Sequence, residues 1–207
     1  MSFSTYKERA WIEVIVGGMF SGKTEELIKR LRRAQYARLK VQAFKPKIDN
    51  RYNEFKITSH NQTTIDSHVI AEIKEIWTHL ENDTKIVGID EAQFFSSDIV
   101  NVVQDLADRG IVVLIAGLDT DWQGKPFGPI PTLMAIAENV HKQHAVCVVC
   151  GDPASRTQRI AAVEGQVVVG SNDIYEARCR KHFKPEVDQK TSPVKFTKQM
   201  TFEEVEQ

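Results

Sequence analysis

The residues from Gly17 to Thr24 have the types and spacing needed to bind a nucleoside triphosphate. Their sequence, GGMFSGKT, fits the pattern GxxxxGK[ST]. The glycines let successive backbone N–H groups point at a phosphate, and Lys23 can neutralise its β and γ oxygens. A chance match is disfavoured because the pattern lies between an apolar run and an amphipathic segment. The predicted ATP-binding residues of this loop are Gly17, Gly18, Met19, Phe20, Ser21, Gly22, Lys23 and Thr24.

Two adjacent carboxylates, Asp90 and Glu91, follow the short apolar run 86–89. An acid at the end of such a strand is the usual partner of the Mg²⁺ that accompanies the triphosphate, and Thr24 is the usual hydroxyl ligand. We therefore assign Thr24 and Asp90 to magnesium. Glu91 could accept a proton from an attacking hydroxyl, as in a kinase, or position a water, as in an ATPase motor. These two residues alone do not separate the alternatives.

Three cysteines and one histidine form two closely spaced pairs. Cys147 and Cys150 make CxxC, and after 28 intervening residues (151–178) Cys179 and His182 make CxxH. Four such ligands suit a structural, tetrahedral Zn²⁺ site, which we favour over a redox-active cysteine pair. Zinc would fix the base of the intervening segment, whose Tyr175 and backbone could then close on a flat base. A zinc ribbon that binds nucleic acid is the alternative, although basic residues are sparse between 167 and 175.

The elements that must position these groups alternate between strands and helices. Apolar runs predict strands over 11–16, 41–45, 86–89 and 111–118. Helical spacing predicts helices over 25–40, 69–80, 96–109 and 132–140, and the polar stretch 46–64 predicts a long loop or a short hairpin. This alternation predicts an α/β fold with a parallel sheet flanked by helices.

A change of composition after residue 140 predicts a domain boundary. We expect a P-loop nucleotide-binding α/β domain over 1–140 and a small zinc-binding lasso domain over 141–186. The polar, aperiodic segment 187–207 is expected to be a flexible tail.

The overall composition excludes several other classes of protein. The chain has 207 residues, and its formal net charge of -1 provides no general attraction to nucleic acid or an acidic membrane surface. The apolar run near the N-terminus is short and contains Glu13, so we expect neither a signal peptide nor a membrane span, and a cytoplasmic protein. The basic residues that follow the P-loop are interpreted as a solvated helix face: Lys29, Arg30, Arg32, Arg33, Arg38 and Lys40.

Five segments taken together resemble the thymidine kinase family, of the type shared by bacteria, animals and poxviruses. They are GGMFSGKTEELIKRLRRA, IDEAQFF, GLDTDWQGKPFGPI, CVVC and GSNDIYEARCRKH, and the resemblance covers roughly residues 10 to 185. Five motifs in one order are far more specific than a P-loop alone, so the resemblance favours a kinase over an ATPase or switch whose zinc ribbon binds nucleic acid or protein. A kinase acting on another nucleoside is a milder alternative.

The resemblance implies an activity and a set of phosphate-side residues. The expected reaction is transfer of the γ-phosphate of ATP to the 5′-hydroxyl of thymidine, with deoxyuridine as a further candidate acceptor. It also implies a homotetramer and feedback by thymidine triphosphate. Glu91 matches the catalytic base and Asp90 the magnesium-site acid. The other residues implied on the ATP side are Asp49, Asn50, Arg51 and Gln93.

The resemblance also implies a largely apolar pocket for the base. Its expected walls are Met19, Phe94, Leu118, Trp122, Phe127 and Tyr175. The backbone expected to contact the pyrimidine edge is that of Gln166, Val167, Val168, Val169 and Gly170. Trp122 stands where phenylalanine is usual and Gly18 where proline or serine is usual, and His182 replaces a cysteine found in some members. None of these departures removes a reacting group.

Overall fold

A parallel six-stranded sheet forms the centre of the molecule, seen in a computed structural model that describes residues 10–47, 56–58, 64–161 and 174–185. The strand order is β5-β2-β6-β7-β1-β8, and every neighbouring pair is parallel. The strands are β1 (Ile12–Val16), β2 (Val41–Pro46), β5 (His68–Ile70), β6 (Ile86–Ile89), β7 (Val112–Gly117) and β8 (Asn139–Lys142). The expected α/β class is therefore confirmed.

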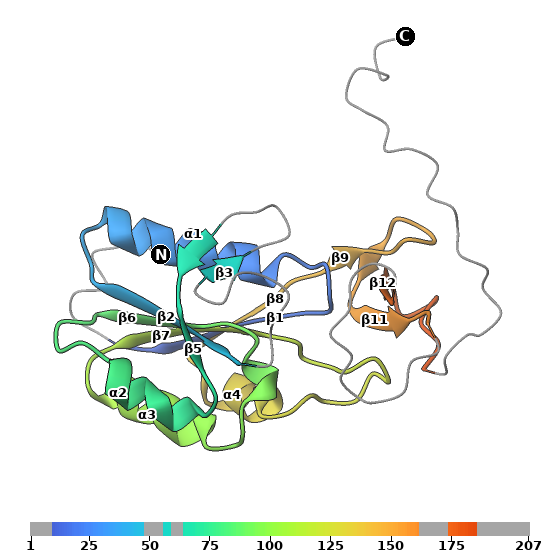
Figure 1. The fold of residues 1–207 in the computed structure, drawn as a ribbon. Helices are drawn as coiled ribbons and strands as arrows, with labels where there is room; N and C mark the ends of the chain where they lie inside the picture. The colour runs from blue at the N-terminus through green and yellow to red at the C-terminus, as the bar shows by residue number, and fades with distance from the viewer. Residues whose placement is uncertain (1–9, 48–55, 59–63, 162–173, 186–207) are drawn as a thin grey trace, which may run out of the picture.

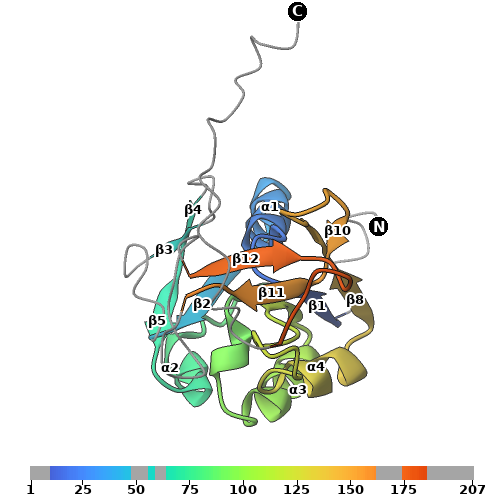
Figure 2. The same cartoon turned by 90° about the vertical axis from the view of Figure 1, so that its right-hand side faces the viewer.

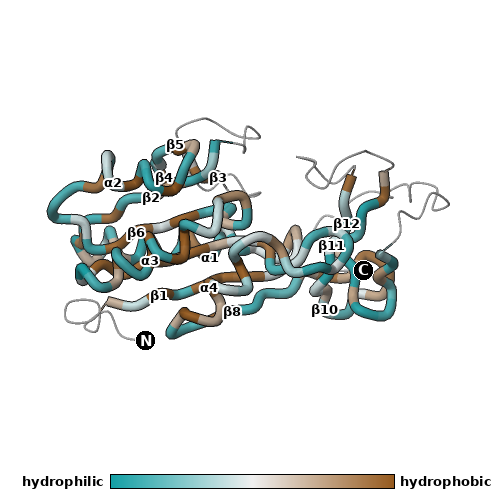
Figure 3. Tube along the Cα trace, turned by 90° about the horizontal axis from the view of Figure 1, so that it is seen from below, coloured by the Kyte–Doolittle hydropathy of each residue, from teal (hydrophilic) through white to brown (hydrophobic). Residues whose placement is uncertain are grey.

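Apolar residues fill most positions of the central strands β1, β6 and β7 because helices cover both faces of the sheet. All residues of β1, β6 and β7 are buried, whereas the edge strand β8 is mostly exposed. Apolar residues accordingly recur along the central strands in Figure 3. Helix α1 (Lys23–Tyr36) lies on one face, and α2 (Ile76–His79), α3 (Ile99–Asp108) and α4 (Ile130–Ile136) lie on the other (Figure 1).

Close packing of α1 on the sheet depends on a glycine in β6. A Cβ atom on Gly88 would lie 2.6 Å from Cδ1 of Leu31, so only glycine lets the helix approach this strand. Leu31 belongs to a buried cluster with Leu27, Ile28 and the central strands. This packing holds the first turn of α1 at the carboxyl end of β1, where the glycine-rich loop runs.

Two expected helices are shorter in the structure. Residues 69–80 begin as strand β5, continue as the 3-10 turn η2 (Ile73–Glu75), and become α-helical only in α2. The helix expected over 132–140 ends at Ile136, because Asn139–Lys142 instead pair with the free edge of β1. Within the polar stretch 46–64, β3 (Lys56–Thr58) begins an antiparallel hairpin with β4 (Thr64–Asp66). The other predicted strands and helices are present, with ends shifted by a few residues.

A small C-terminal unit lies beyond the carboxyl end of the sheet (Figures 1 and 2). It contains two antiparallel pairs, β9 (Ala145–Val146) with β10 (Pro153–Ala154), and β11 (Arg156–Arg159) with β12 (Tyr175–Arg178). Its buried cluster consists of small side chains only: Ala145, Cys147, Ala154, Ala177 and Cys179. So little apolar area cannot stabilise a fold by itself, which is the situation in which small domains use a bound metal.

The basic face of α1 is solvated except at one residue. Arg30 makes an ion pair with the buried carboxylate of Glu13 in β1, and His141 Nε2 lies 2.8 Å from the same carboxylate. This pairing explains how a glutamate is tolerated inside an otherwise apolar strand. No helix in the described part of the chain is both long enough and apolar enough to cross a bilayer.

Candidate active site

The glycine-rich loop connects β1 to α1 at the carboxyl edge of the sheet. Gly17 has φ +150°, and a Cβ atom there would lie 2.3 Å from the backbone oxygen of Gln143. Gly22, with φ +80°, caps the start of α1. Lys23 Nζ and Ser21 Oγ each donate to the carbonyl oxygen of Gly18 at 2.8 Å, which draws the loop into a curl above the helix N-terminus. The positive end of the helix dipole and the lysine side chain together favour binding of an anion in this loop.

Thr24 and Asp90 lie together at the base of this loop. Thr24 Oγ1 is 3.3 Å and 3.2 Å from the two carboxylate oxygens of Asp90, which exposes only 6% of its surface. The Asp90 backbone N–H donates to Phe44 O at 3.0 Å and so continues the β2–β6 ladder by one residue. A hydroxyl and a carboxylate are hard oxygen donors of the kind Mg²⁺ prefers, so these two residues fit the ion.

Glu91 turns away from Asp90 although it is the next residue. Its φ of +51° is left-handed, a conformation that costs a non-glycine residue about 1–3 kcal/mol and that starts the 3-10 turn η3 (Ala92–Phe94). Gln93 donates from Nε2 to Glu91 Oε2, and its Oε1 accepts from the backbone N–H of Leu118 at 3.0 Å. Gln93 is 3% exposed. It therefore connects the ends of β6 and β7 through its side-chain amide.

Four aromatic residues of the expected pocket form two groups. Phe94 and Phe127 meet edge to face, with ring centroids 5.8 Å apart. Trp122 and Tyr175 both contact the guanidinium of Arg159, whose central carbon lies 4.2 Å and 5.5 Å from their ring centroids. The first group joins η3 to the loop after β7, and the second joins the same loop to β12.

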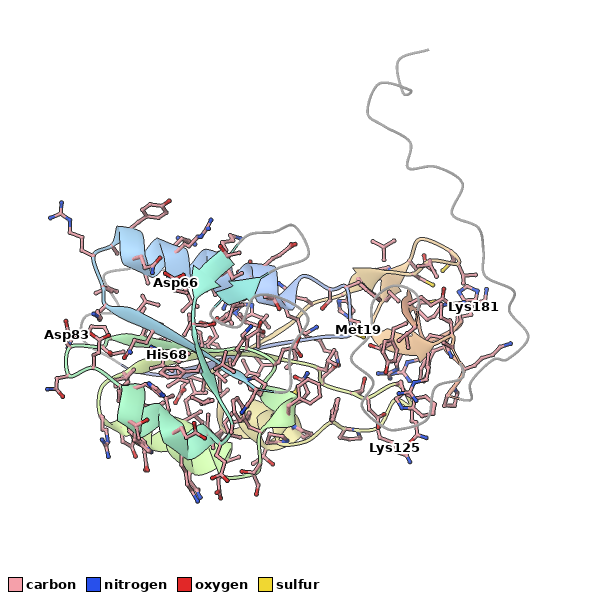
Figure 4. The ribbon with its side chains drawn as sticks, viewed as in Figure 1. Met19, Asp66, His68, Asp83, Lys125 and Lys181 are labelled. Carbon is pink, nitrogen blue, oxygen red and sulfur yellow. The ribbon has the colours of Figure 1, made fainter. Side chains whose placement is uncertain are left out.

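The P-loop also contacts the C-terminal unit directly. The backbone N–H of Met19 donates to Thr157 Oγ1 in β11 at 3.0 Å, and a Cβ atom on Gly18 would lie 3.2 Å from the same oxygen. Figure 4 labels Met19 at this junction between the sheet and β11. The P-loop is therefore held against β11, the strand that pairs with β12 and its Tyr175.

Two functional candidates were not found from the sequence. Asp119 lies two residues beyond β7, as Asp90 lies one residue beyond β6, and an acid close after an apolar strand is a signal that could have identified it. Its Oδ2 lies 2.7 Å from Lys142 Nζ, but neither oxygen has a well-directed hydrogen bond within the described residues. We interpret the contact as an ion pair, since Coulomb attraction needs no linear geometry. The sequence gives no signal for Arg159, because a charged residue in the polar segment RTQR is expected to be exposed.

Three cysteines and one histidine converge beside β9 and β12. The ligand atoms of Cys147, Cys150, Cys179 and His182 all lie within 4.8 Å of one another. Cys150 Sγ and Cys179 Sγ are 3.7 Å apart, and His182 Nδ1 lies 3.7 Å from Cys147 Sγ and 3.3 Å from Cys179 Sγ. A tetrahedral zinc with bonds of about 2.3 Å has sulfur–sulfur edges of about 3.8 Å, whereas a disulfide is about 2.05 Å. The set therefore fits zinc.

The environment of Cys147 also favours a metal-binding thiolate. Burial raises the pKa of its thiol, but hydrogen bonds from backbone N–H groups of Cys179, Val149 and Cys150 outweigh burial and lower this pKa to about 6. At Cys150 a backbone hydrogen bond from Asp152 lowers the pKa, yet burial and the neighbouring acidic and thiol groups raise it to about 12. A thiolate is the form that binds metal, and the first of these ligands is predisposed to it.

Two groups of predicted residues lie outside the described part of the chain. They are the phosphate-side segment Asp49, Asn50 and Arg51, and the backbone from Gln166 to Gly170. The remaining predicted residues gather at the carboxyl edge of the sheet, in the loops after β1, β6 and β7, and in β12 with the adjoining cysteine cluster. This is the edge at which ligands bind in open parallel sheets.

Comparison with known proteins gives the family. Residues 10–183 match the family model described as thymidine kinase. A thymidine kinase of Bdellovibrio bacteriovorus is 66% identical over 198 residues, which cover 96% of this chain and 97% of that protein. A thymidine kinase of a Rhodothermus species is 50% identical over 185 residues, covering 89% of this chain and 86% of that protein. By its sequence, the chain belongs to the thymidine kinase family.

Proposed function

We propose that this chain transfers the γ-phosphate of ATP to the 5′-hydroxyl of thymidine, with Glu91 as the general base. One observation carries the assignment: adjacent carboxylates have separate environments. Asp90 lies against Thr24 of the P-loop, whereas the backbone turn at Glu91 directs its carboxylate to Gln93. Gln93 in turn contacts the backbone of Leu118, an expected wall of the nucleoside pocket. A base beside the acceptor and an acid beside the donor are what the transfer needs.

Different residues of the chain are proposed to bind the phosphates, to hold Mg²⁺ and to accept the proton. Lys23 and the backbone N–H groups of 17–22 would bind the β- and γ-phosphates, at the positive end of α1. Thr24 and Asp90 would hold Mg²⁺, which when bound neutralises charge on the phosphate oxygens. Arg51, with Asp49 and Asn50, is assigned to the same side of the site by family resemblance. As the 5′-hydroxyl attacks the γ-phosphorus, Glu91 accepts its proton.

The nucleoside would lie between the aromatic residues and the C-terminal unit. Met19, Phe94, Leu118, Trp122, Phe127 and Tyr175 are its proposed walls. The backbone from Gln166 to Gly170 is proposed to meet the pyrimidine edge. We further propose that residues 141–186 act as a lasso whose base is fixed by zinc on Cys147, Cys150, Cys179 and His182. Excluding water in this way suppresses hydrolysis of ATP.

Family membership bears on the substrates, assembly and regulation of this protein. Membership of the family implies ATP and thymidine as substrates, and deoxyuridine is proposed as a further acceptor. A cytoplasmic homotetramer inhibited by thymidine triphosphate is proposed from the same resemblance. A triphosphate of the product nucleoside would combine a base for the proposed aromatic walls with phosphates for the P-loop.

Glu91→Gln tests the central assignment. Thymidine monophosphate formation should fall by about 10²- to 10⁴-fold, the usual contribution of a general base, while ATP binding is retained. Glu81→Gln is the matched control, because Glu81 pairs with Lys40 on the surface and should leave the rate unchanged. Nearly full thymidine phosphorylation by Glu91→Gln would show that another group accepts the proton.

A further inference from the structure

Arg159 is buried more completely than its charge alone would allow. It exposes 1% of its surface and ends β11, where it is paired in register with Tyr175 of β12. Its Nη2 donates to the Tyr175 hydroxyl at 2.9 Å, and its guanidinium lies over the indole of Trp122 at 4.2 Å. Burying a guanidinium costs free energy, which a purely structural role could avoid with an apolar side chain of similar size.

The two aromatic partners of Arg159 come from different parts of the chain. Trp122 belongs to the loop that leaves the carboxyl end of β7, and Tyr175 belongs to the C-terminal unit. The same loop meets that unit again at Gly124, where a Cβ atom would lie 3.1 Å from the Phe183 ring. Arg159 therefore connects one wall carried by the sheet to one wall carried by the zinc-binding unit.

The chemistry of arginine suits this connection. A planar guanidinium can stack on an aromatic face and still donate hydrogen bonds along its edge, whereas lysine offers a compact point charge. Tryptophan is the most favourable aromatic partner for a cation, and the attraction strengthens when both groups are removed from water. One side chain thereby fixes the distance and the tilt of two rings.

We propose that Arg159 is a positioning residue that sets the spacing of the Trp122 and Tyr175 walls of the nucleoside pocket. It acts through these two rings and not by touching the substrate. The proposal rests on the proposed assignment of both rings to that pocket. Replacing Arg159 should consequently weaken thymidine binding and leave ATP binding close to normal, because Lys23 is held by the Gly18 carbonyl oxygen and Thr24 by Asp90, at the other end of the site.

The test uses the full chain with Trp122 as its only tryptophan, made by Trp11→Phe and Trp77→Phe. Thymidine binding is measured by equilibrium dialysis and by the change in Trp122 emission. ATP binding is measured in parallel on the same variants. We expect Arg159→Met to shift the Trp122 emission before any ligand is added and to raise the thymidine Kd by about tenfold or more. ATP binding should change less than about twofold, and Arg159→Lys should recover part of the thymidine affinity because it restores the cation.

Arg178→Met is the matched control, since Arg178 lies in β12, the partner strand of β11, and its guanidinium pairs with Glu176. It should leave thymidine binding and Trp122 emission unchanged. Thermal midpoints and zinc content establish folding, and Arg159→Lys carries the test should Arg159→Met not fold. Unchanged thymidine affinity in a folded Arg159 variant, or equal losses for thymidine and ATP, would overturn the proposal. If thymidine binds the parent protein without altering Trp122 emission, the assignment of Trp122 to the nucleoside pocket is wrong. If the parent protein forms no thymidine monophosphate, the proposed function itself is refuted.

Discussion

The side-chain amide of Gln93 holds the carboxylate of Glu91 by donating from Nε2 to Oε2. The backbone at Glu91 is strained, with φ +51°, and the amide is almost wholly buried, so both the turn and its partner are fixed. Because Oε1 of the same amide accepts from the Leu118 N–H, a shift of the loop after β7 would be transmitted to the proposed base. Gln93 is also expected on the ATP side, and its side chain contacts Glu91 and the backbone of Leu118.

Gln93→Met should therefore lower kcat more than it lowers binding of ATP. The variant keeps the volume but removes both hydrogen bonds, leaving the Leu118 N–H unpaired at a cost of about 1–3 kcal/mol in unfolding free energy. We expect kcat for thymidine to fall at least about tenfold, since a misplaced base loses proton-transfer efficiency. Steady-state kinetics and urea unfolding measure the two effects.

Gln42→Met provides the comparison for Gln93→Met. Gln42 is also buried, and its amide binds His79 O, the Glu81 N–H and the Thr84 hydroxyl at the opposite end of the sheet. This variant should lose stability to a similar extent while kcat stays unchanged. Equal kcat values for the two variants would mean that Gln93 contributes stability alone.

Much of this site follows from local patterns in the sequence. The P-loop, the acids after 86–89 and the cysteine spacing each need only the order of residues along one segment, and the α/β class needs only the alternation of apolar runs. Arg159 and Thr157 lie beyond such reasoning, because their importance comes from contacts with Trp122 and Met19, far away in the chain. The edge strand β8 was missed for a similar reason: only the free edge of β1 decides that 139–142 is extended.

Gly17→Ala should abolish tight ATP binding. A Cβ atom at this position would lie 2.3 Å from the Gln143 oxygen and 2.8 Å from Ser21 Oγ, and φ +150° is unfavourable for alanine. The first of these neighbours is backbone, so the loop must move and the curl of N–H groups is lost. We expect ATP affinity to fall by at least about tenfold, measured by isothermal titration.

The control for this clash is Gly110→Ala. Gly110 has φ +83° but no atom within 4 Å of an added Cβ, so it isolates the backbone penalty, about 1–2 kcal/mol, from steric overlap. Its ATP affinity should equal that of the parent protein. An unaltered ATP affinity in Gly17→Ala would show that the loop can rearrange without losing its anion site.

Removing zinc should impair thymidine binding more than ATP binding. The C-terminal unit has a buried cluster of only small residues, so its fold depends on the four proposed ligands, and it carries Tyr175 and Arg159. The sheet that carries the P-loop has its own large apolar core. Metal analysis should find about one zinc per chain in fresh protein. Chelation, or Cys179→Ser, should lower the thermal midpoint and thymidine affinity together.

Two measurements make the zinc prediction specific. Adding zinc back should restore thymidine binding, whereas adding magnesium should not, because thiolate and imidazole ligands favour zinc. Ser155→Ala alters a hydroxyl of the same unit outside the ligand set and should leave zinc content unchanged. Absence of stoichiometric zinc in freshly purified protein would contradict the four-ligand assignment.

His68 should contribute to loss of stability in mild acid. Burial, reinforced by the neighbouring His79 ring 4.8 Å away, holds the pKa of His68 below its usual value, although Glu81 acts in the opposite direction. The folded state therefore disfavours the charged ring, which also stacks on Phe44 and lies beside Gln42. In the unfolded chain the ring takes up a proton near pH 6.5, so stability is fully present above about pH 6.5 and is lost as pH falls below it.

His68→Gln should accordingly reduce the loss of unfolding free energy between pH 7.5 and pH 5.5. Urea unfolding of parent and variant at both pH values gives this difference, and any constant cost of losing the Phe44 stack cancels in it. His144→Gln, which removes an exposed histidine near β9, should retain the parent's pH dependence. An identical acid loss in parent and His68→Gln would mean that other groups account for it, the Cys147 and His182 ligands among them, because protonating metal ligands also destabilises the fold.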